Sequence, residues 1–426
     1  MTSILLKNIS CNGILSDIYI EGTRIKRIMP VGSTGGDGDC RIASGVEVMD
    51  CEGKTAVPGF INMHTHAAMS IMRGTGEDVV FADWIREIWE METRIDADFV
   101  YWGTKIACLE MIKTGTTTFN DQYWYSPYAR RAAIEMGIRP VISYVAIDHN
   151  DKEECECQKE KCEQAYADSL DVKDGGIFEM AFHAIYSTSE KLMCWVSEFA
   201  KKHNLKLHIH LCETEKEVLD CKEAHGGLTP VEYLDRLGIL DQNVLAAHTL
   251  WLTDNDIEIL GKHHVNCVHN INSNTKLASG YKFRYNELRD AGANVCIGTD
   301  GCASSNNLDM LEAMKTAALF QKAWRNDPKA LPLNELISLA TVNGAKALGL
   351  DTGVLEEGKI ADILIVNTEN SFFVSPGSFL SNLIYSAHSD CIEYVIAGGK
   401  FVMRNRKVKD EAQIIANAQE QLVKII

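Results

Sequence analysis

The sequence predicts an α/β protein whose central part forms a (β/α)₈ barrel and whose two ends are rich in β-strands. Between about residues 60 and 300, eight short apolar runs alternate with mostly amphipathic helical stretches. The 426 residues exceed the roughly 250–300 at which a single core usually stops growing, so an accessory region beside the barrel is expected. A doubly wound open sheet is the alternative. No G-x-G-x-x-G motif follows the first apolar run, which disfavours that alternative.

The first 58 residues consist of short strand-like segments. "SILLKNI" and "DIYIEGTRIKRIMP" are rich in β-forming residues, and "EGTR" is typical of a hairpin turn. A flexible loop is expected over residues 32–40, "GSTGGDGDC". Residues 353–366 and 391–405 again show strand–turn–strand patterns. The chain therefore begins and ends with the same kind of structure.

The eight apolar runs lack strict alternation, which is typical of strands buried on both faces of a parallel sheet. They cover residues 60–66, 116–121, 140–147, 179–186, 205–212, 244–250, 265–271 and 294–300. Two of the intervening helices are clearly marked. Residues 189–204 begin with a Ser and a Glu that can cap a helix, and residues 97–115 end at a glycine suited to the position after a helix.

The composition excludes several classes of partner. A net charge of -17 argues against nucleic acid and anionic membranes, because both need a basic surface. The sequence shows no secretion signal and no apolar stretch near the ~18 residues of a membrane span, so a cytoplasmic location is expected. The 14 cysteines are then expected to be free buried thiols. A metal clip formed by Cys155, Cys157 and Cys162 is the weaker alternative.

Histidines and carboxylates follow the predicted strands at their carboxyl ends, where a (β/α)₈ barrel carries its active site. His64 and His66 in "FINMHTH" are two residues apart and therefore point to the same side of a strand. His208 and His210 in "HIHLCET" have the same spacing, and one of these two imidazoles can supply a third ligand. Glu213 follows His210 by three residues, and the later predicted strands carry or end at His248, His269 and Asp300.

Imidazoles with one carboxylate predict a site for a divalent metal, zinc or iron, with an open position for water. Such a metal lowers the pKa of its water toward about 7. Asp300 is then suited to touch the metal and accept the proton, Glu213 to carry protons to a leaving group, and His248 to orient the attacking water. The fourth run, "EMAFHAIY", has no lysine to bridge two metals. A single metal is therefore expected, and His183 on that run is free for a substrate.

With these residues in place, the chain resembles the amidohydrolase superfamily, in particular its methylthioadenosine/S-adenosylhomocysteine deaminase group. The resemblance runs over nearly the whole chain. It is carried by "PGFINMHTHAAMSIMRGTGED", "METR", "GTTTFND", "HIHLCETEKE", "AAHTLWL", "HNINSNTKLASG", "GTDGCASSNNLDMLEAM" and "GVLEEGKIADILIV". It implies a barrel over residues 59–353 beside a small β-sandwich formed by residues 1–58 and 354–426. It also implies a homo-oligomer.

The resemblance assigns roles to individual residues. Four positions match the metal ligands of the family: His64, His66, His210 and Asp300. Glu213 matches the acid that protonates the ring nitrogen and then the leaving amine, and His248 matches the histidine beside the nucleophilic water. Glu92 resembles the acid that holds the ribose hydroxyls, and His183 resembles a substrate-contacting histidine. The implied reaction converts a 5′-modified adenosine (5′-methylthioadenosine, S-adenosylhomocysteine, 5′-deoxyadenosine or adenosine itself) to the inosine analogue and ammonia.

One departure from the family bears on the substrate. Members that accept S-adenosylhomocysteine grip its carboxylate with arginines after the third strand, but residues 143–174 contain no arginine. A neutral 5′-group is therefore favoured. Two alternatives remain open. One is a deaminase or chlorohydrolase of another nitrogen heterocycle, such as guanine, 8-oxoguanine, a pterin or a triazine. The more remote one is a scaffold without catalysis, although the ligand set is intact.

Overall fold

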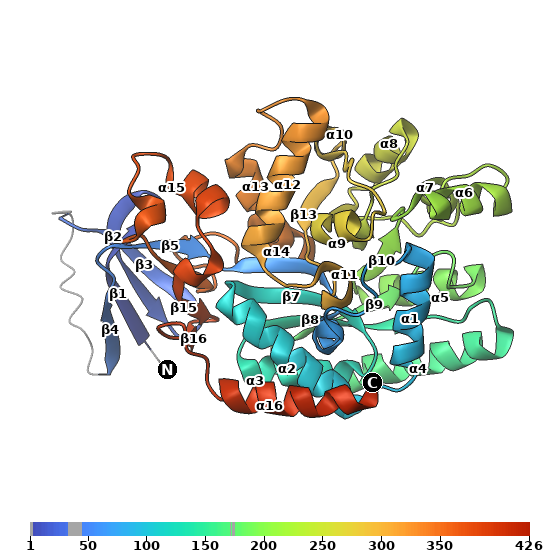
Figure 1. Ribbon diagram of the computed structural model, residues 1–426, viewed down its shortest axis with the longest axis horizontal. Helices are drawn as coiled ribbons and strands as arrows, with labels where there is room; N and C mark the ends of the chain where they lie inside the picture. Colours follow the sequence, from blue (N-terminus) through green and yellow to red (C-terminus); the bar gives the residue numbers. More distant parts are fainter. Residues whose placement is uncertain (1–2, 33–44, 171, 173–174) are drawn as a thin grey trace.

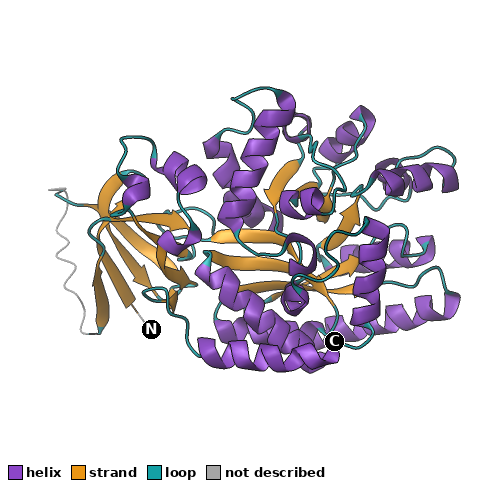
Figure 2. Cartoon of the chain, viewed as in Figure 1, coloured by secondary structure: helices purple, strands orange, loops and turns teal. Residues whose placement is uncertain are grey.

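A computed structural model describes residues 3–32, 45–170, 172 and 175–426, and it contains two sheets (Figures 1 and 2). In one sheet all strands are parallel and follow each other in chain order. Its strands are β6 (Phe60–Thr65), β7 (Thr116–Tyr123), β8 (Arg139–Ala146), β9 (Ile177–Phe182), β10 (Leu207–Leu211), β11 (Val244–His248), β12 (Asn266–His269) and β13 (Asn294–Ile297). Each overlaps one of the eight predicted runs, so the predicted (β/α)₈ class is confirmed.

The first and last strands of this sheet meet at their carboxyl ends and close the barrel. The backbone N–H of Asp300 donates to the carbonyl of His64 at 2.9 Å, and that of Thr299 donates to Oδ1 of Asn62 at 3.1 Å. Gly298 permits this approach, because a Cβ atom there would lie 2.8 Å from the backbone nitrogen of His64. The closure brings the polar end of β13 directly beside that of β6.

Helices surround the barrel strands (Figure 2). They are α1 (Phe81–Glu92), α2 (Ala97–Lys113), α3 (Ser126–Met136), α4 (Lys152–Leu170), α5 (Glu190–His203), α6 (Glu215–Ala224), α7 (Pro230–Arg236), α8 (Asp254–Lys262), α9 (Ile271–Lys276), α10 (Tyr285–Ala291), α11 (Cys302–Ser305), α12 (Met310–Arg325), α13 (Leu333–Leu339) and α14 (Val342–Leu348). The two marked helices are confirmed as α2 and α5. The side chain of Ser189 caps α5 by accepting from the N–H of Leu192.

The second sheet joins the two ends of the chain, with the order β16–β15–β14–β5–β1–β2–β3 and β4 beside β1. Its strands are β1 (Ser3–Cys11), β2 (Ile14–Glu21), β3 (Arg24–Pro30), β4 (Val46–Asp50), β5 (Lys54–Pro58), β14 (Ile363–Asn367), β15 (Ile392–Ala397) and β16 (Lys400–Met403). β1 changes partner from β4 to β5 along its length, and its register shifts near Asn8, whose φ is 57°. The strands enclose a separate core that includes Ile9, Ile18 and Ile363.

Most of the predicted local structure at the chain ends is confirmed. β2 and β3 form a hairpin around Gly22 and Thr23, and β15 pairs antiparallel with β16. The strand–turn–strand prediction for residues 353–366 was half wrong. Only β14 forms, because residues 353–362 turn back to bond β3, where the N–H of Ile25 donates to the carbonyl of Lys359. From residue 33 on, the loop predicted at 32–40 lies outside the described residues.

The last helix leaves the small sheet. After α15 (Phe379–Ser381), α16 (Glu411–Gln421) runs alongside α2 of the barrel (Figure 1). Lys424, just beyond α16, pairs with Asp96 at 2.7 Å. We propose the domain boundaries 1–58 with 354–426 and 59–353, with α16 as an extension onto the barrel. None of the helices in the described part of the chain combines the length and apolar character that a membrane crossing needs.

Candidate metal centre and substrate pocket

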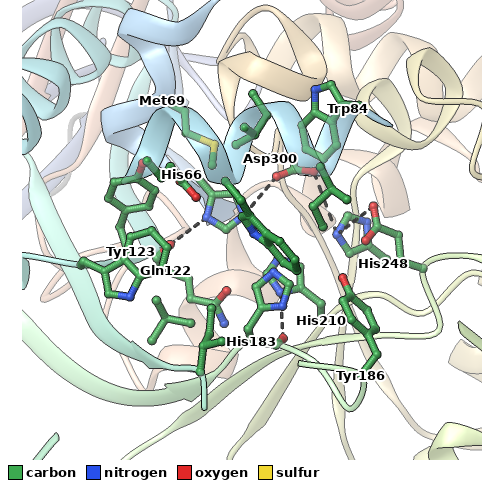
Figure 3. A pocket seen from close by; sticks show the side chains of 18 of the residues that line it. His66, Met69, Trp84, Gln122, Tyr123, His183, Tyr186, His210, His248 and Asp300 are labelled. Atoms are coloured by element: carbon green, nitrogen blue, oxygen red, sulfur yellow. Dashed lines mark hydrogen bonds and ion pairs between the residues drawn. The ribbon is translucent and has the colours of Figure 1, made fainter. Parts of the chain in front are cut away.

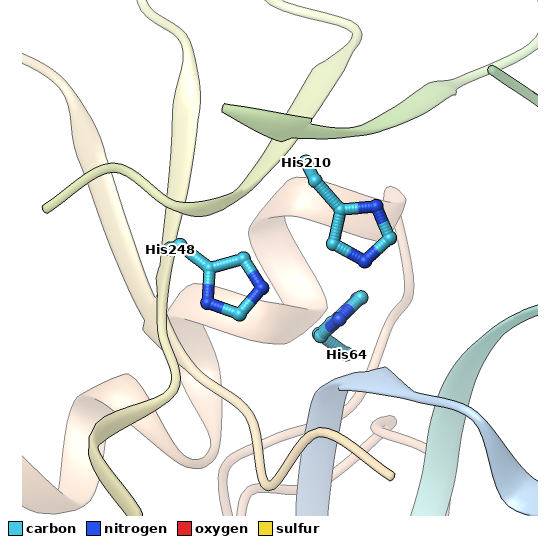
Figure 4. Close-up of side chains that lie close together, drawn as sticks. All are labelled: His64, His210 and His248. Carbon is cyan, nitrogen blue, oxygen red and sulfur yellow. The ribbon is translucent and has the colours of Figure 1, made fainter. Parts of the chain in front are cut away.

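Four of the predicted residues, His64, His66, His210 and Asp300, converge at the carboxyl ends of β6, β10 and β13. Figure 3 shows His66, His210 and Asp300, and Figure 4 shows His64 beside His210. Nε2 of His64 and Nε2 of His66 each lie 3.4 Å from Oδ1 of Asp300. Nε2 of His210 lies 3.3 Å from Nε2 of His66. Ligand atoms on a tetrahedral zinc ion with bonds of about 2.1 Å are separated by about 3.4 Å. The spacing of these side chains therefore fits a single divalent ion between them.

The hydrogen bonds of the histidines leave the right atoms free for a metal. Nδ1 of His66 bonds the carbonyl of Gln122 at 2.7 Å, and Nδ1 of His210 bonds that of His183 at 2.9 Å. Each Nε2 therefore presents a lone pair to the centre. Nε2 of His64 is buried and has no hydrogen-bond partner. Burial holds the pKa of His64 and of His210 well below the ordinary value, which keeps both rings in the neutral form that metals bind.

His248, at the end of β11, stands beside this group. Figure 4 shows its ring facing His64 and His210, and one nitrogen of each of the three lies within 4.8 Å of the others. Nε2 of His248 is 4.0 Å from Oδ2 of Asp300 and 3.8 Å from Oε1 of Glu213. These separations are longer than those among the four residues above. His248 is therefore better placed to contact a water or a substrate atom at the centre.

Left-handed backbone conformations gather at the same strand ends. φ is 54° at Cys212, 75° at His248, 41° at Thr249 and 64° at Asp300, although none of these residues is glycine. Such conformations cost of order 1–3 kcal/mol each and persist only where the surrounding structure enforces them. At Asp300 the conformation lets Oδ1 accept from the N–H of Gly301 at 2.7 Å. The chain turns sharply here while keeping the carboxylate at the centre.

Glu213 is buried next to Asp300, and its own backbone is held firmly. Both oxygens of the Glu217 carboxylate accept backbone N–H groups, from Cys212 at 2.9 Å and from Glu213 at 2.8 Å. Burial, together with the charges of Asp300 and Glu217, raises the pKa of Glu213 well above its ordinary value. Burial alone would raise the pKa of Asp300 too, but the adjacent imidazoles of His64 and His66 hold it well below its ordinary value. The neighbouring carboxyls are thus set apart as acid and base.

Glu92 and His183 line the same pocket. Oε1 of Glu92, at the end of α1, accepts from the hydroxyl of Tyr123 at 2.7 Å. Burial raises the pKa of Glu92 to about 7, against the opposing effect of this hydrogen bond. Nδ1 of His183 lies 2.8 Å from Oγ of Ser187, and burial lowers the pKa of His183 to about 3. Both side chains are able to contact a substrate whose reacting atom lies at the centre.

Beyond Glu92 the pocket adjoins an outer cavity of about 730 Å³. The two spaces share the side chains of Trp89, Glu92, Trp124 and Ile147. Lys161 on α4 is the only lysine or arginine among the described residues that line the outer cavity, and its Nζ lies 3.3 Å from Oε1 of Glu154. The outer cavity thus has an apolar wall and a cation that is already paired.

The sequence did not settle the roles of two histidines, His208 and His269, and gave no role to the carboxylate of Glu179. His208 lies below the centre, with Nε2 2.8 Å from Nδ1 of His64, and its own Nδ1 is 3.0 Å from Oε1 of Glu179. The signal for Glu179 was a charged residue inside the apolar strand "IFEMAF". His269 is not part of the pocket. Its ring stacks on Phe283 with the centroids 4.0 Å apart.

The three cysteines considered as a metal clip lie on α4. Cys155 and Cys162, seven residues apart, are buried, whereas Cys157 is half-buried, and all three are free thiols. In the described residues, the clusters of His, Cys, Asp and Glu able to hold a metal contain none of them. Their packing matches the expectation of free thiols.

Comparison with known proteins identifies relatives of the whole chain. It is 42% identical over 381 residues to a 5′-deoxyadenosine deaminase of Methanoregula boonei, covering 89% of this chain and 86% of the relative. It is 39% identical over 427 residues to 5-methylthioadenosine/S-adenosylhomocysteine deaminase 1 of Archaeoglobus fulgidus, covering 98% of each.

Solved structures share the architecture. An adenosine deaminase from Xanthomonas campestris with bound zinc superposes with a TM-score of 0.90 and 29% identity, covering 100% of this chain and 98% of that one. A zinc-bound atrazine chlorohydrolase from Arthrobacter aurescens, 24% identical, has the same fold with a TM-score of 0.88, covering 98% of this chain and 100% of that one. The model of the amidohydrolase family matches residues 55–402. The chain therefore belongs to the amidohydrolase family.

Proposed function

We propose that the protein is a metal-dependent hydrolytic deaminase that converts 5′-modified adenosines to the corresponding inosine analogues and ammonia. The observation that carries this proposal is the convergence of His64, His66, His210 and Asp300, at the spacing of metal ligands, with Glu213 beside them. The names of the Methanoregula and Archaeoglobus relatives support an adenosine derivative as the substrate.

The residues of the chain divide the chemistry among them. When bound, the divalent metal lowers the pKa of a water ligand toward about 7. Asp300, held ionised, accepts a proton from the attacking water, and His248 orients that water. Glu213, whose pKa is raised, donates its proton to the ring nitrogen, takes up the second proton of the attacking water and delivers it to the leaving amine as the C–N bond breaks. The proton held by Asp300 then restores Glu213. Glu92 accepts hydrogen bonds from the ribose hydroxyls, and His183 contacts the substrate.

We infer a neutral 5′-group, as in 5′-deoxyadenosine or 5′-methylthioadenosine. The outer cavity beyond Glu92 exposes Trp89, Trp124 and Ile147, which suit a small apolar group. A homocysteine carboxylate would meet Lys161, which already pairs with Glu154. No guanidinium fork is available among the described lining residues.

An ammonia-release screen tests the substrate class. The panel contains 5′-deoxyadenosine, 5′-methylthioadenosine, S-adenosylhomocysteine, adenosine, guanine, 8-oxoguanine, a pterin and a triazine. We expect the highest kcat/KM with 5′-deoxyadenosine or 5′-methylthioadenosine and a lower value with S-adenosylhomocysteine. Preferred turnover of a free heterocycle would overturn the nucleoside assignment, because Glu92 would then have no ribose to hold.

We infer one zinc ion for each chain, with iron as the alternative, because three imidazoles and a carboxylate bind both metals. Elemental analysis of the purified protein is expected to give close to one equivalent of metal. Removal of the metal by a chelator is expected to reduce ammonia release to background, and added zinc should restore it. A protein with less than about half an equivalent and unchanged turnover after chelation would contradict the metal-dependent mechanism. Sedimentation analysis tests the homo-oligomer that the family resemblance implies.

A further inference from the structure

His64 differs from the other two proposed histidine ligands in the partner of its second ring nitrogen. His66 and His210 bond through Nδ1 to main-chain carbonyls. Nδ1 of His64 instead lies 2.8 Å from Nε2 of the His208 side chain. Main-chain carbonyls are neutral acceptors at fixed positions. A side-chain partner can itself be hydrogen-bonded to a charged group, and the imidazole is then polarised by that charge.

The hydrogen-bonded line continues from His208 to a buried carboxylate. Nδ1 of His208 lies 3.0 Å from Oε1 of Glu179, and Nδ2 of Asn120 donates to the other carboxylate oxygen at 3.4 Å. His64, His208 and Glu179 are all 0% exposed. A carboxylate at this depth is strongly disfavoured unless it is paired and hydrogen-bonded. The line connects β9, β10 and β6 across the interior of the barrel.

The direction of the protons follows from the position of the metal site. If Nε2 of His64 presents its lone pair to a metal, the ring proton sits on Nδ1 and is donated to His208. His208 then carries its own proton on Nδ1 and donates it to Glu179. Every donor in the line meets an acceptor, and the line ends on a carboxylate. The negative charge of Glu179 thereby polarises the ring of His64 toward the metal.

We propose that Glu179 and His208 are positioning residues that orient His64 and strengthen it as a metal ligand. The proposal rests on the proposed metal centre and goes beyond its four ligands. A divalent ion bound by three neutral imidazoles and the carboxylate of Asp300 keeps a net charge of +1. Glu179 supplies the balancing charge from inside the barrel without reaching the ion. A purely structural role would instead require only that Glu179 and His208 satisfy each other's hydrogen-bonding groups inside the barrel.

Metal affinity measured together with the stability of the metal-free protein separates these roles. The variants are Glu179→Gln, which keeps the shape but removes the charge, and His208→Gln, which keeps an acceptor for His64 but interrupts the line. Asp256→Asn is the matched control, because Asp256 is also a fully buried carboxylate but bonds Thr229 and Thr253. Zinc affinity is measured by competition with a chromophoric chelator, and the visible spectrum of the cobalt-substituted protein reports the ligand geometry.

Glu179→Gln and His208→Gln are expected to weaken zinc binding about 10–100-fold and to alter the cobalt spectrum. Asp256→Asn is expected to lower the melting temperature of the metal-free protein without changing zinc affinity. Zinc affinity within about threefold of wild type in both line variants would overturn the proposal, as would affinity losses that merely follow lowered apo stability. If the wild-type protein itself binds no zinc, the proposed metal centre fails instead, which is a distinct result.

Discussion

The inner end of the pocket and its outer cavity are built from different parts of the barrel. At the inner end, buried side chains on the ends of β6, β10 and β13 are each fixed by a hydrogen bond or by the backbone. The outer cavity is lined largely by α1, α4 and the segment after β7, and its charged pair is exposed, with Glu154 at 41% and Lys161 at 47%. We therefore propose that the strands hold the groups that react, whereas helices and loops set which 5′-group fits.

The largest effect is expected at the inner end. Glu213→Gln removes the only proton that this position can deliver, so kcat should fall about 10²–10⁴-fold, the usual contribution of a general acid. KM and zinc content should change little, because Glu213 is not among the four ligands. Steady-state ammonia release with the best substrate of the screen measures the effect. A loss below about tenfold would show that the two regions do not divide chemistry from specificity in this way.

Glu92 lies at the boundary between the two regions, and we expect its substitution to have an intermediate effect on the kinetics. Its pKa of about 7 is above the ordinary value, so the carboxyl of the free enzyme becomes protonated, and a weaker acceptor, as pH falls through 7. We therefore expect kcat/KM for an adenosine substrate to decline below about pH 7 with this pKa. Glu92→Gln should raise KM about 10–100-fold, which corresponds to the loss of a hydrogen bond to a charged group, and should remove the part of that pH dependence that Glu92 contributes.

The matched control for Glu92→Gln is deamination of free adenine, which has no ribose. Its rate, however low, should be the same in wild type and variant. A kcat/KM profile for wild type that stays flat between about pH 6 and 8 would contradict the assignment of Glu92 as the ribose acceptor, because the group that titrates would then not contact substrate.

The two regions also differ in how far the sequence predicted them. Because the barrel gathers strand ends, histidines and a carboxylate at several of these ends together predicted a metal site at the inner end, although the residues alone left His208 and His210 as alternatives and only the family resemblance pointed to His210. The spacing of His208 and His210 puts both on one side of β10, and depth along the strand decides their partners. His210, nearer the carboxyl end, faces the centre, whereas His208 lies deeper and bonds His64. Glu179 was missed because its partner is 29 residues away and only the fold joins them.

The side chains that line the outer cavity could not be predicted from the sequence, for a physical reason. The absence of arginine in residues 143–174 indicated a missing carboxylate grip, but it did not show what stands there instead. That α4 turns Lys161 and Glu154 toward the same cavity depends on how the helix is rotated against β8. The weak periodicity of this highly charged helix did not determine that rotation.

The smallest effect is expected from the charged pair of the outer cavity, and it tests the comparison most directly. Glu154→Gln releases Lys161 from its partner and removes one of the carboxylates that would repel a homocysteine carboxylate. Exposed ion pairs contribute about 0.2–1 kcal/mol, so kcat/KM for S-adenosylhomocysteine should rise by roughly 1.4- to 5-fold. The value for 5′-deoxyadenosine should stay the same, because its 5′-methyl group carries no charge. The double variant Glu154→Gln, Lys161→Gln is the control and should lose the gain. Equal changes for both substrates would instead mean that α4 affects the inner end, and the separation of chemistry from specificity would then not hold for this barrel.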